Sequence, residues 1–216
     1  MDLVQQLLLM LGGVVETLAI SIFSLLLGLL IGLPLSFVKV YEKGFRFFVD
    51  GFERIFRGIP EIVLMLMFYF GLGMYFQFPF KNAFFTAFFV LGLRSAANQS
   101  QIFRGAIRGI GEEQMLAARS LGLSRLRSIT SVMVPQVFIF STPGLGSEYA
   151  LLVKDSSYAF VIGVLDIMKT TDMIRAATYD FVTPYLAAAL LYILLTFPIA
   201  TWLDTWGSRR KKKLGL

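Results

Sequence analysis

Several polar side chains interrupt the long apolar stretches of this 216-residue sequence. Ionisable groups inside a membrane are costly, and by default they mark the path of a polar solute, an ion or a proton. The strongest candidate is Glu148, which stands among Pro, Gly and aromatic residues and could pair with an ammonium or guanidinium group through charge-assisted hydrogen bonds. The candidate binding residues are Glu148, Asn98, Ser95 and Arg94.

Most of these residues also have a purely structural interpretation. Glu148 could pair internally with Arg94 or lie at the interface beside Lys154. Asn98 and Ser95 could add hydrogen bonds to a ligand. Arg94 could anchor a carboxylate, but an arginine at the inner edge of a span more commonly snorkels towards water. Glu16 is expected at the rim of the site, near the outer surface. For Asp155, Ser156 and Ser157 the sequence leaves the depth in the membrane open.

A second polar feature is a helix-favouring segment at 112–125, inside a basic region at about 104–131. Ala117, Ala118 and Leu121 fall on one side of the expected helix, and Gly122 follows as a break typical of a helix C-cap. Such a short helix is suited to lie in a groove of another protein, although a solvated loop is the simpler alternative. The residues assigned to this contact are Leu116, Ala117, Ala118, Ser120, Leu121, Gly122 and Ser124.

The composition excludes several kinds of chemistry. The sequence has no Cys and no His, so it lacks disulfides, thiolate metal sites, and the commonest metal ligand and general base. The Gly-rich pieces at 71–76 and 143–149 lack the Lys-Ser/Thr ending of a phosphate-binding loop. We therefore expect no enzyme activity, no cofactor and no metal in this chain, and it is not expected to hydrolyse ATP alone.

The elements that position these residues are expected to be membrane-spanning helices. Hydrophobic residues make up 56% of the sequence, charged residues 16%, and the mean hydropathy is +0.72, so the chain is far more apolar than a soluble domain. We expect an all-α membrane protein with one domain, 1–216, and five transmembrane helices. The expected spans cover about 12–38, 61–78, 83–103, 132–153 and 183–206.

Two of these spans have unusual features. In the first, Gly28 and Gly32 form a small-xxx-small pair, which either permits close helix packing or arises by chance. The fourth contains two prolines and two glycines, so we expect a short or irregular span. Residues 1–11 carry no Lys or Arg, so we expect the first span to be retained rather than cleaved as part of a signal peptide.

The basic residues indicate the orientation. Sixteen of the twenty Lys and Arg residues fall in three groups, at 39–57, 94–127 and 209–213. Because positive residues favour the cytoplasmic side, we expect the N-terminus outside, the C-terminus in the cytoplasm and the segment 112–125 in the cytoplasm. Topology therefore accounts for the net charge of +6, and no nucleic-acid partner is expected.

The segment 112–125 and its continuation resemble a cytoplasmic loop of bacterial ABC importer membrane subunits. That loop reads Glu-Ala-Ala, three residues, Gly, nine residues, an aliphatic residue, one more residue and Leu-Pro. Ala117-Ala118, Gly122 and Pro135 keep this spacing, whereas Leu116 stands where the family has Glu. Three further stretches, at 52–60, 101–107 and 143–157, are similar to motifs of the polar amino acid permeases, the group that handles arginine, histidine, glutamine and glutamate.

The resemblance implies a type I ABC importer permease in the bacterial inner (cytoplasmic) membrane, which moves a polar amino acid into the cytoplasm. The carboxylate of Glu148 favours a cationic one. The implied partners of the permease are ATP-binding subunits, a second copy or a homologous permease, an extracytoplasmic amino-acid-binding protein and membrane lipid. ATP and Mg would be bound by the ATP-binding subunit, which the segment 112–125 would contact. The alternative from another class is a self-contained secondary transporter or channel, for which an internal inverted repeat is expected but not visible.

Overall fold

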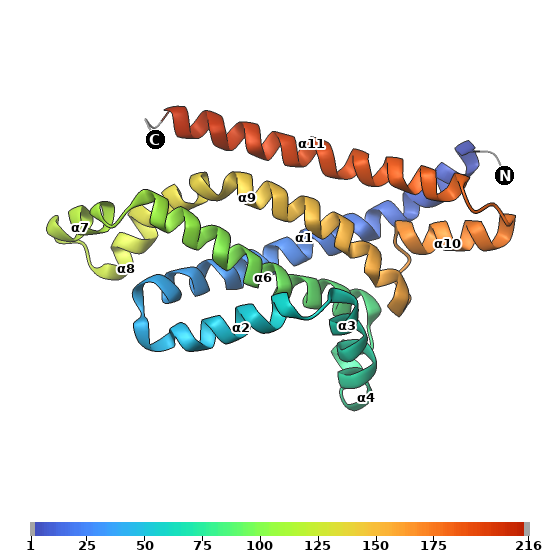
Figure 1. Ribbon diagram of the computed structural model, residues 1–216, viewed down its shortest axis with the longest axis horizontal. Coiled ribbons are helices and arrows are strands. Elements are labelled where there is room, and N and C mark those ends of the chain that lie inside the picture. Colours follow the sequence, from blue (N-terminus) through green and yellow to red (C-terminus); the bar gives the residue numbers. More distant parts are fainter. Residues whose placement is uncertain (1–2, 214–216) are drawn as a thin grey trace.

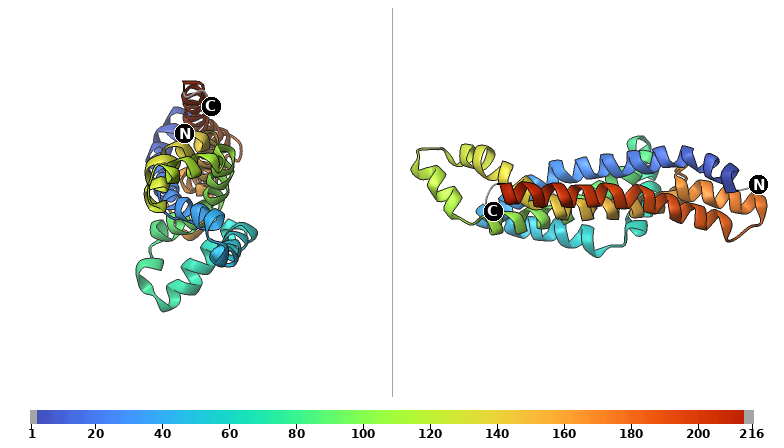
Figure 2. Two further views of the ribbon diagram at one scale, coloured as in Figure 1. Left: turned by 90° about the vertical axis from the view of Figure 1, so that its left-hand side faces the viewer. Right: turned by 90° about the horizontal axis from the view of Figure 1, so that it is seen from above.

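The computed structural model describes residues 3–213, and every regular element in that range is helical. Four long helices lie side by side along the long axis of the molecule (Figure 1; Figure 2). They are α1 (Leu3–Tyr41), α6 (Ala83–Ile110), α9 (Val134–Asp155) and α11 (Thr183–Lys213). α6 packs along both α1 and α9, and α11 packs along α9. The predicted all-α class is confirmed for this range.

Shorter helices lie at the two ends and on one side of these four helices. α7 (Glu113–Ser120) and α8 (Arg125–Ser128) lie at the end opposite to α10 (Ile167–Thr178) (Figure 1). α2 (Arg46–Gly58) runs beside α6, and α3 (Glu61–Leu66) then turns away. The other elements are the 3₁₀-helices η1 (Lys43–Phe45) and η4 (Ser156–Ile162), the π-helices η2 (Met67–Leu72) and η3 (Ile129–Met133), α4 (Gly73–Tyr75) and α5 (Gln77–Phe80).

The described chain contains three stretches that are long and apolar enough to cross a membrane, Val4–Tyr41, Arg125–Ile162 and Thr183–Lys212. A fourth arises if α2 and the bent stretch after it count as one broken span. α6 covers the predicted span 83–103, but the polar residues of its second half lower its hydropathy. A protein with several apolar helices is therefore confirmed, whereas five crossings and the orientation of the termini stay predictions.

The predicted span 61–78 is not one straight helix. The chain bends by 99° between α2 and the stretch Glu61–Tyr75. Ile59 is extended, with φ −98° and ψ 131°, because the ring of Pro60 disfavours a helical backbone in the residue before it. Residues 39–60, which lie between the first two predicted spans, contain a helix, α2, that packs on α6.

α1 and α6 approach each other closely at two glycines. A Cβ atom added to Gly32 would lie 2.7 Å from the backbone oxygen of Ala96, and one added to Gly28 would lie 2.7 Å from the hydroxyl of Ser95. Both distances are shorter than van der Waals contact, so any larger residue would push the helices apart. The small-xxx-small pair therefore marks a packing contact.

The fourth predicted span, 132–153, is more regular than the sequence suggests. α9 runs without interruption from Val134 to Asp155, although Pro143 lies inside it. Proline has no amide hydrogen, so the carbonyl of Ile139 lacks its helical donor. The Thr142 hydroxyl donates a hydrogen bond of 3.0 Å to that carbonyl, which satisfies the acceptor inside the helix. The expectation of an irregular span is wrong for α9, and the irregular backbone is confined to η3.

α10 begins at a buried carboxyl group outside the apolar stretches. Asp166 is fully buried, and its Oδ1 accepts a hydrogen bond of 2.7 Å from the Lys169 amide as the N-cap of the helix. Burial raises the pKa of Asp166 to about 7, although hydrogen bonds from backbone amides oppose this shift. The Ile167 amide donates to the Thr17 hydroxyl at 3.3 Å, which ties this helix start to α1.

Candidate functional site

One face of α6 carries a row of polar side chains. Arg94, Asn98, Gln101 and Arg104 are spaced by three or four residues, so they lie above one another on the helix surface. Their hydrogen-bond partners come from α2, α3 and α9. The row therefore occupies the side of α6 that faces those helices, while Ala96 and its neighbours pack against α1.

Arg94 is held by two carboxylates from different helices. Its Nη1 donates a hydrogen bond of 2.8 Å to Oδ2 of Asp155 on α9, and its guanidinium also pairs with Glu61 on α3. The three side chains are all largely buried, at 14–19% exposure. The guanidinium is therefore committed to internal ion pairs, which differs from both the ligand anchor and the snorkelling residue considered from the sequence.

Asn98 links the next two charged groups. Arg57 Nε on α2 donates a hydrogen bond of 3.0 Å to Oδ1 of Asn98, and Nδ2 of Asn98 donates one of 3.2 Å to Oε2 of Glu148. Three helices, α2, α6 and α9, thus contribute one residue each to a continuous chain of hydrogen bonds. We call Arg57, Asn98 and Glu148 the polar relay.

The carboxylate of Glu148 is almost completely buried, with 2% of the residue exposed. Its Oε1 has no hydrogen bond of good geometry within residues 3–213, although the Ser95 hydroxyl lies beside the carboxylate. Ser95 also accepts a hydrogen bond of 2.9 Å from Gln99, which leaves its own O–H free to donate towards Glu148. A buried oxygen without a donor costs free energy, so this position favours binding of a ligand donor. Among the described residues, Glu148 forms no ion pair with Arg94 or Lys154.

Glu53 joins α1, α2 and α6 closer to the α7 end of the molecule. Its carboxylate accepts hydrogen bonds from Lys39 at 2.6 Å, from Ser100 at 3.0 Å and from Arg104 at 3.3 Å. Only 4% of Glu53 is exposed, so each donor compensates for the burial of this charge. The group holds α2 against both long helices.

A polar cleft of ≈ 500 Å³ opens beside Glu53, between α2 and α6. Its walls include Glu53, Arg54 and Arg57 from α2 and Gln101 and Arg104 from α6. Arg57 belongs to both this cleft and the polar relay, so the cleft leads to the residues that contact Glu148.

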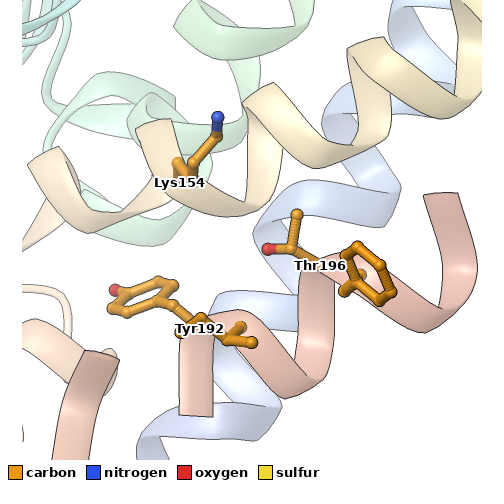
Figure 3. A pocket seen from close by; sticks show the side chains of 5 residues that line it. Lys154, Tyr192 and Thr196 are labelled. Atoms are coloured by element: carbon orange, nitrogen blue, oxygen red, sulfur yellow. The ribbon is translucent and has the colours of Figure 1, made fainter. Parts of the chain in front are cut away.

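A smaller pocket between α9 and α11 lies apart from this site. It encloses ≈ 190 Å³, and Lys154, Tyr192 and Thr196 contribute its polar atoms (Figure 3). The wall of the pocket is mainly apolar, and none of the predicted binding residues lines it. The pocket therefore lacks the chemistry expected for a polar solute.

The other polar residues singled out from the sequence have structural partners or lie elsewhere. Asp155 pairs with Arg94, and the Ser156 hydroxyl donates to the Val153 carbonyl at 2.8 Å. Glu16 is partly exposed in the first half of α1. None of these residues joins the polar relay.

The segment 112–125 forms a short helix with a well-defined end. The Leu123 amide donates to the Ala118 carbonyl at 3.2 Å, and the Gly122 amide donates to the Arg119 carbonyl at 3.0 Å. This pair of bonds defines a Schellman motif, which needs a left-handed residue at Gly122, where φ is +84°. The predicted helix and its glycine break are both present. α8 then starts at Ser124, whose hydroxyl accepts a bond from the Arg127 amide.

Most residues assigned to the contact are exposed on this segment. Leu116 is 63% exposed and Leu121 is 83% exposed, although both are apolar. Ala117, Ser120, Gly122 and Ser124 are exposed as well. Ala118 differs, because it is buried and 4% exposed, so it supports the segment from inside and is not available to a partner.

Arg125 connects the segment to the end of α1. Its guanidinium pairs with Glu42 at 2.7 Å and donates to the Tyr41 carbonyl at 2.9 Å, and it also lies over the Tyr41 ring. These contacts fix the position of α8 relative to α1.

The sequence did not reveal Glu53, Arg57 and Glu61 as members of these clusters. All three fall between the first two predicted spans or at the start of the second one. The available signal was the Gly58-Ile59-Pro60 sequence between Arg57 and Glu61, because a proline-induced bend brings residues on both sides of it towards the neighbouring helix.

Comparisons with known proteins agree with this architecture. Residues 24–213 match the family model described as "Binding-protein-dependent transport system inner membrane component". The "Arginine transport system permease protein ArtQ" of Bacillus subtilis is 32% identical over 203 residues, covering 94% of this chain and 92% of that protein. The "Arginine ABC transporter permease protein ArtQ" of Haemophilus influenzae is 35% identical over 199 residues, covering 87% of each chain.

A solved structure is also similar over nearly the whole chain. It is described as "Crystal structure of an amino acid ABC transporter with histidines", with a TM-score of 0.81, 29% identity and coverage of 95% of this chain and 96% of that chain. The matched family and these relatives are membrane permease subunits, not enzymes. The chain therefore belongs to the family of binding-protein-dependent transport system inner membrane components.

Proposed function

We propose that this permease carries a polar, cationic L-amino acid into the cytoplasm by alternating access, as part of an ATP-driven importer. The observation that carries the proposal is the charge of the site. Three carboxylates, from Glu61, Glu148 and Asp155, face the two guanidiniums of Arg57 and Arg94. Within these five side chains one negative charge is left over, and a cationic substrate would neutralise it. The names of the two arginine permeases support this choice of cargo.

The segment 112–125 would couple transport to a separate ATP-binding subunit. The exposed apolar side chains of Leu116 and Leu121 are suited to a groove on that subunit, and the Schellman motif fixes the helix that presents them. ATP and Mg would be bound by that subunit. Movement of the segment would be transmitted directly to α6, because only two residues separate α6 from α7.

The working assembly would contain two permeases, this chain with a second copy or a homologous chain, on two ATP-binding subunits. An extracytoplasmic binding protein would deliver the amino acid to the side of α10. This arrangement needs the N-terminus outside and the segment 112–125 in the cytoplasm of a bacterial cell, in agreement with the distribution of basic residues.

The test is reconstitution of the complete assembly in vesicles with a set of labelled amino acids. We expect arginine and lysine to stimulate ATP hydrolysis and to accumulate more than glutamine does. Uptake that persists without an ATP-binding subunit would rule out an importer of this kind. Equal uptake of cationic and neutral amino acids would show that the leftover negative charge does not select the cargo.

A further inference from the structure

The two ends of the polar relay have fixed and opposite chemistry. The Arg57 guanidinium can only donate hydrogen bonds, and an ionised Glu148 carboxylate can only accept them. The amide of Asn98 satisfies both, because its oxygen accepts from Arg57 at 3.0 Å and its nitrogen donates to Glu148 at 3.2 Å. A ligand that replaced the amide would need an acceptor at one end and a donor at the other.

The length of the relay restricts that ligand further. The oxygen and nitrogen of a carboxamide are about 2.3 Å apart, as follows from its bond lengths. In an α-amino acid, the ammonium nitrogen and the nearer carboxylate oxygen are about 2.7 Å apart by the same geometry. The side-chain cation of lysine or arginine is separated from the carboxylate by several more bonds. Among the groups of lysine or arginine, the two on the α-carbon are therefore the pair that matches the spacing that Asn98 now occupies.

We infer that Arg57 and Glu148 bind the carboxylate and the ammonium group of the α-carbon, and that the Asn98 amide holds their place when no amino acid is bound. This inference rests on the proposed transport of an amino acid. It names Arg57 as a binding residue, and it assigns Glu148 to the group that all amino acids share.

The exchange is favourable on two grounds. Asn98 offers each charged partner a neutral group, whereas an amino acid offers each of them an opposite charge, and hydrogen bonds between ions are the stronger kind. Access is available as well, because Arg57 lines the polar cleft of ≈ 500 Å³ between α2 and α6, which has room for an amino acid. The incoming carboxylate would meet Arg57 before the ammonium reaches the buried Glu148.

The assignment separates recognition of the α-carbon from recognition of the side chain. The zwitterion neutralises Arg57 and Glu148 together, so the remaining negative charge belongs to Arg94 and its two carboxylates, Glu61 and Asp155. Preference for a cationic side chain would then come from this second group. Glu148→Gln should consequently weaken binding of arginine and of glutamine to similar extents.

The test is equilibrium binding of labelled L-arginine to the complete permease and ATP-binding complex in lipid nanodiscs, without the extracytoplasmic binding protein. Two competitors probe the α-carbon. Agmatine lacks the carboxylate, and the 2-hydroxy analogue of arginine lacks the ammonium. We expect each to bind about ten- to one-hundredfold more weakly than arginine, as the loss of one charge-assisted hydrogen bond implies. Agmatine that competes as well as arginine would overturn the inference without any variant.

Variants then test which residue binds the carboxylate and which binds the ammonium group. Arg57→Gln should weaken arginine binding by about tenfold or more and leave agmatine unchanged, and Glu148→Gln should do the same for arginine against its hydroxy analogue. Arg54→Gln is the matched control, because Arg54 lines the same cleft but does not enter the polar relay. Co-purification with the ATP-binding subunit verifies that each variant is assembled. Equal loss for arginine and agmatine in Arg57→Gln would contradict the assignment.

Asn98→Ala tests the place-holding role directly. Removal of an internal competitor should leave arginine affinity unchanged or increase it, whereas loss of a true ligand residue would reduce it about tenfold. A tenfold reduction would therefore count against the inference. The two proposals fail in different ways. Binding of glutamine but not of arginine would refute the cationic cargo and keep the α-carbon assignment, and an absence of binding by any amino acid would refute both.

Discussion

Arg94 on α6 and Asp155 on α9 form an ion pair with 2.8 Å between Nη1 and Oδ2, and both side chains are largely buried. Arg94→Gln would leave the carboxylates of Asp155 and Glu61 without their shared partner. Breaking a buried pair in this way costs about 3–5 kcal/mol, so we expect a large fall in the unfolding temperature of the purified permease.

The control for Arg94 is Arg175→Gln. Arg175 and Asp172 also form a pair at 2.7 Å, but they are three residues apart on α10 and about one-third exposed. An exposed pair contributes little to stability, so this variant should unfold close to the parent temperature. Equal losses for the two variants would show that burial of Arg94 does not determine its contribution.

Gly122→Val should uncouple the permease from its ATP-binding subunit. The left-handed backbone at Gly122, with φ +84°, costs about 1–2 kcal/mol for a residue with a Cβ atom, so the Schellman motif would be lost. We expect normal membrane insertion but little transport-linked ATP hydrolysis in vesicles. Gly105→Ala is the control, since that glycine lies within α6 with open space around it. Full coupling in Gly122→Val would contradict the assigned role of the segment.

Gly32→Val should separate α1 from α6. Its Cβ would lie 2.7 Å from the backbone oxygen of Ala96, which cannot move without displacing the helix. Overpacking of this kind costs about 1–3 kcal/mol, measurable as a lower unfolding temperature in detergent. Gly12→Val, on the same helix with no atom within 4 Å of the added Cβ, should have a much smaller effect.

Asp166 should make the stability of the protein depend on pH. Its pKa is about 7 in the folded protein, above the ordinary value of 3.8, so the folded state binds more protons between these values. The stabilising contribution of the protonated carboxyl is fully present below pH 3.8 and is lost as the pH rises through about 7. The titratable groups that interact with it are Lys169 and Tyr192.

Asp166→Asn tests this dependence, because asparagine keeps a capping oxygen and cannot ionise. The variant should be only slightly more stable than the parent at pH 5, and this difference in thermal stability should be much larger at pH 8.5. A difference that stays constant across this range would show that the carboxyl group does not titrate there.

Much of the fold could be predicted because long apolar runs indicate long helices without any knowledge of tertiary contacts. The turn at Gly122 followed from residue type, since glycine suits a left-handed backbone. For Gly28 and Gly32 the sequence left close packing and chance open, and the structure shows close packing. α9 was mispredicted because Pro143 is normally disruptive, and the compensating hydroxyl of Thr142 becomes visible only in the helix.

Glu148, Asn98 and Ser95 lie together in the structure, and their role in binding stays a prediction. The sequence suggested Glu148 as the partner of Arg94, whereas the structure gives Glu61 and Asp155. Glu61 follows the bend at Pro60, which spacing along the sequence does not reveal. Arg57 was missed for the same reason, since α2 packs on α6 only as a consequence of that bend.

α6 is one uninterrupted 28-residue helix that carries the polar row and ends two residues before α7. A helix of this length is about 42 Å long and stiff, so a movement at the segment 112–125 would be transmitted along it to Asn98. A rotation of α6 by about 100°, the angle between successive residues of a helix, is not needed to move Asn98. A small rotation at its α7 end would move the Asn98 amide out of line with Arg57 and Glu148. If the segment 112–125 contacts the ATP-binding subunit as proposed, a movement of that subunit would therefore also change which groups are free to bind the amino acid.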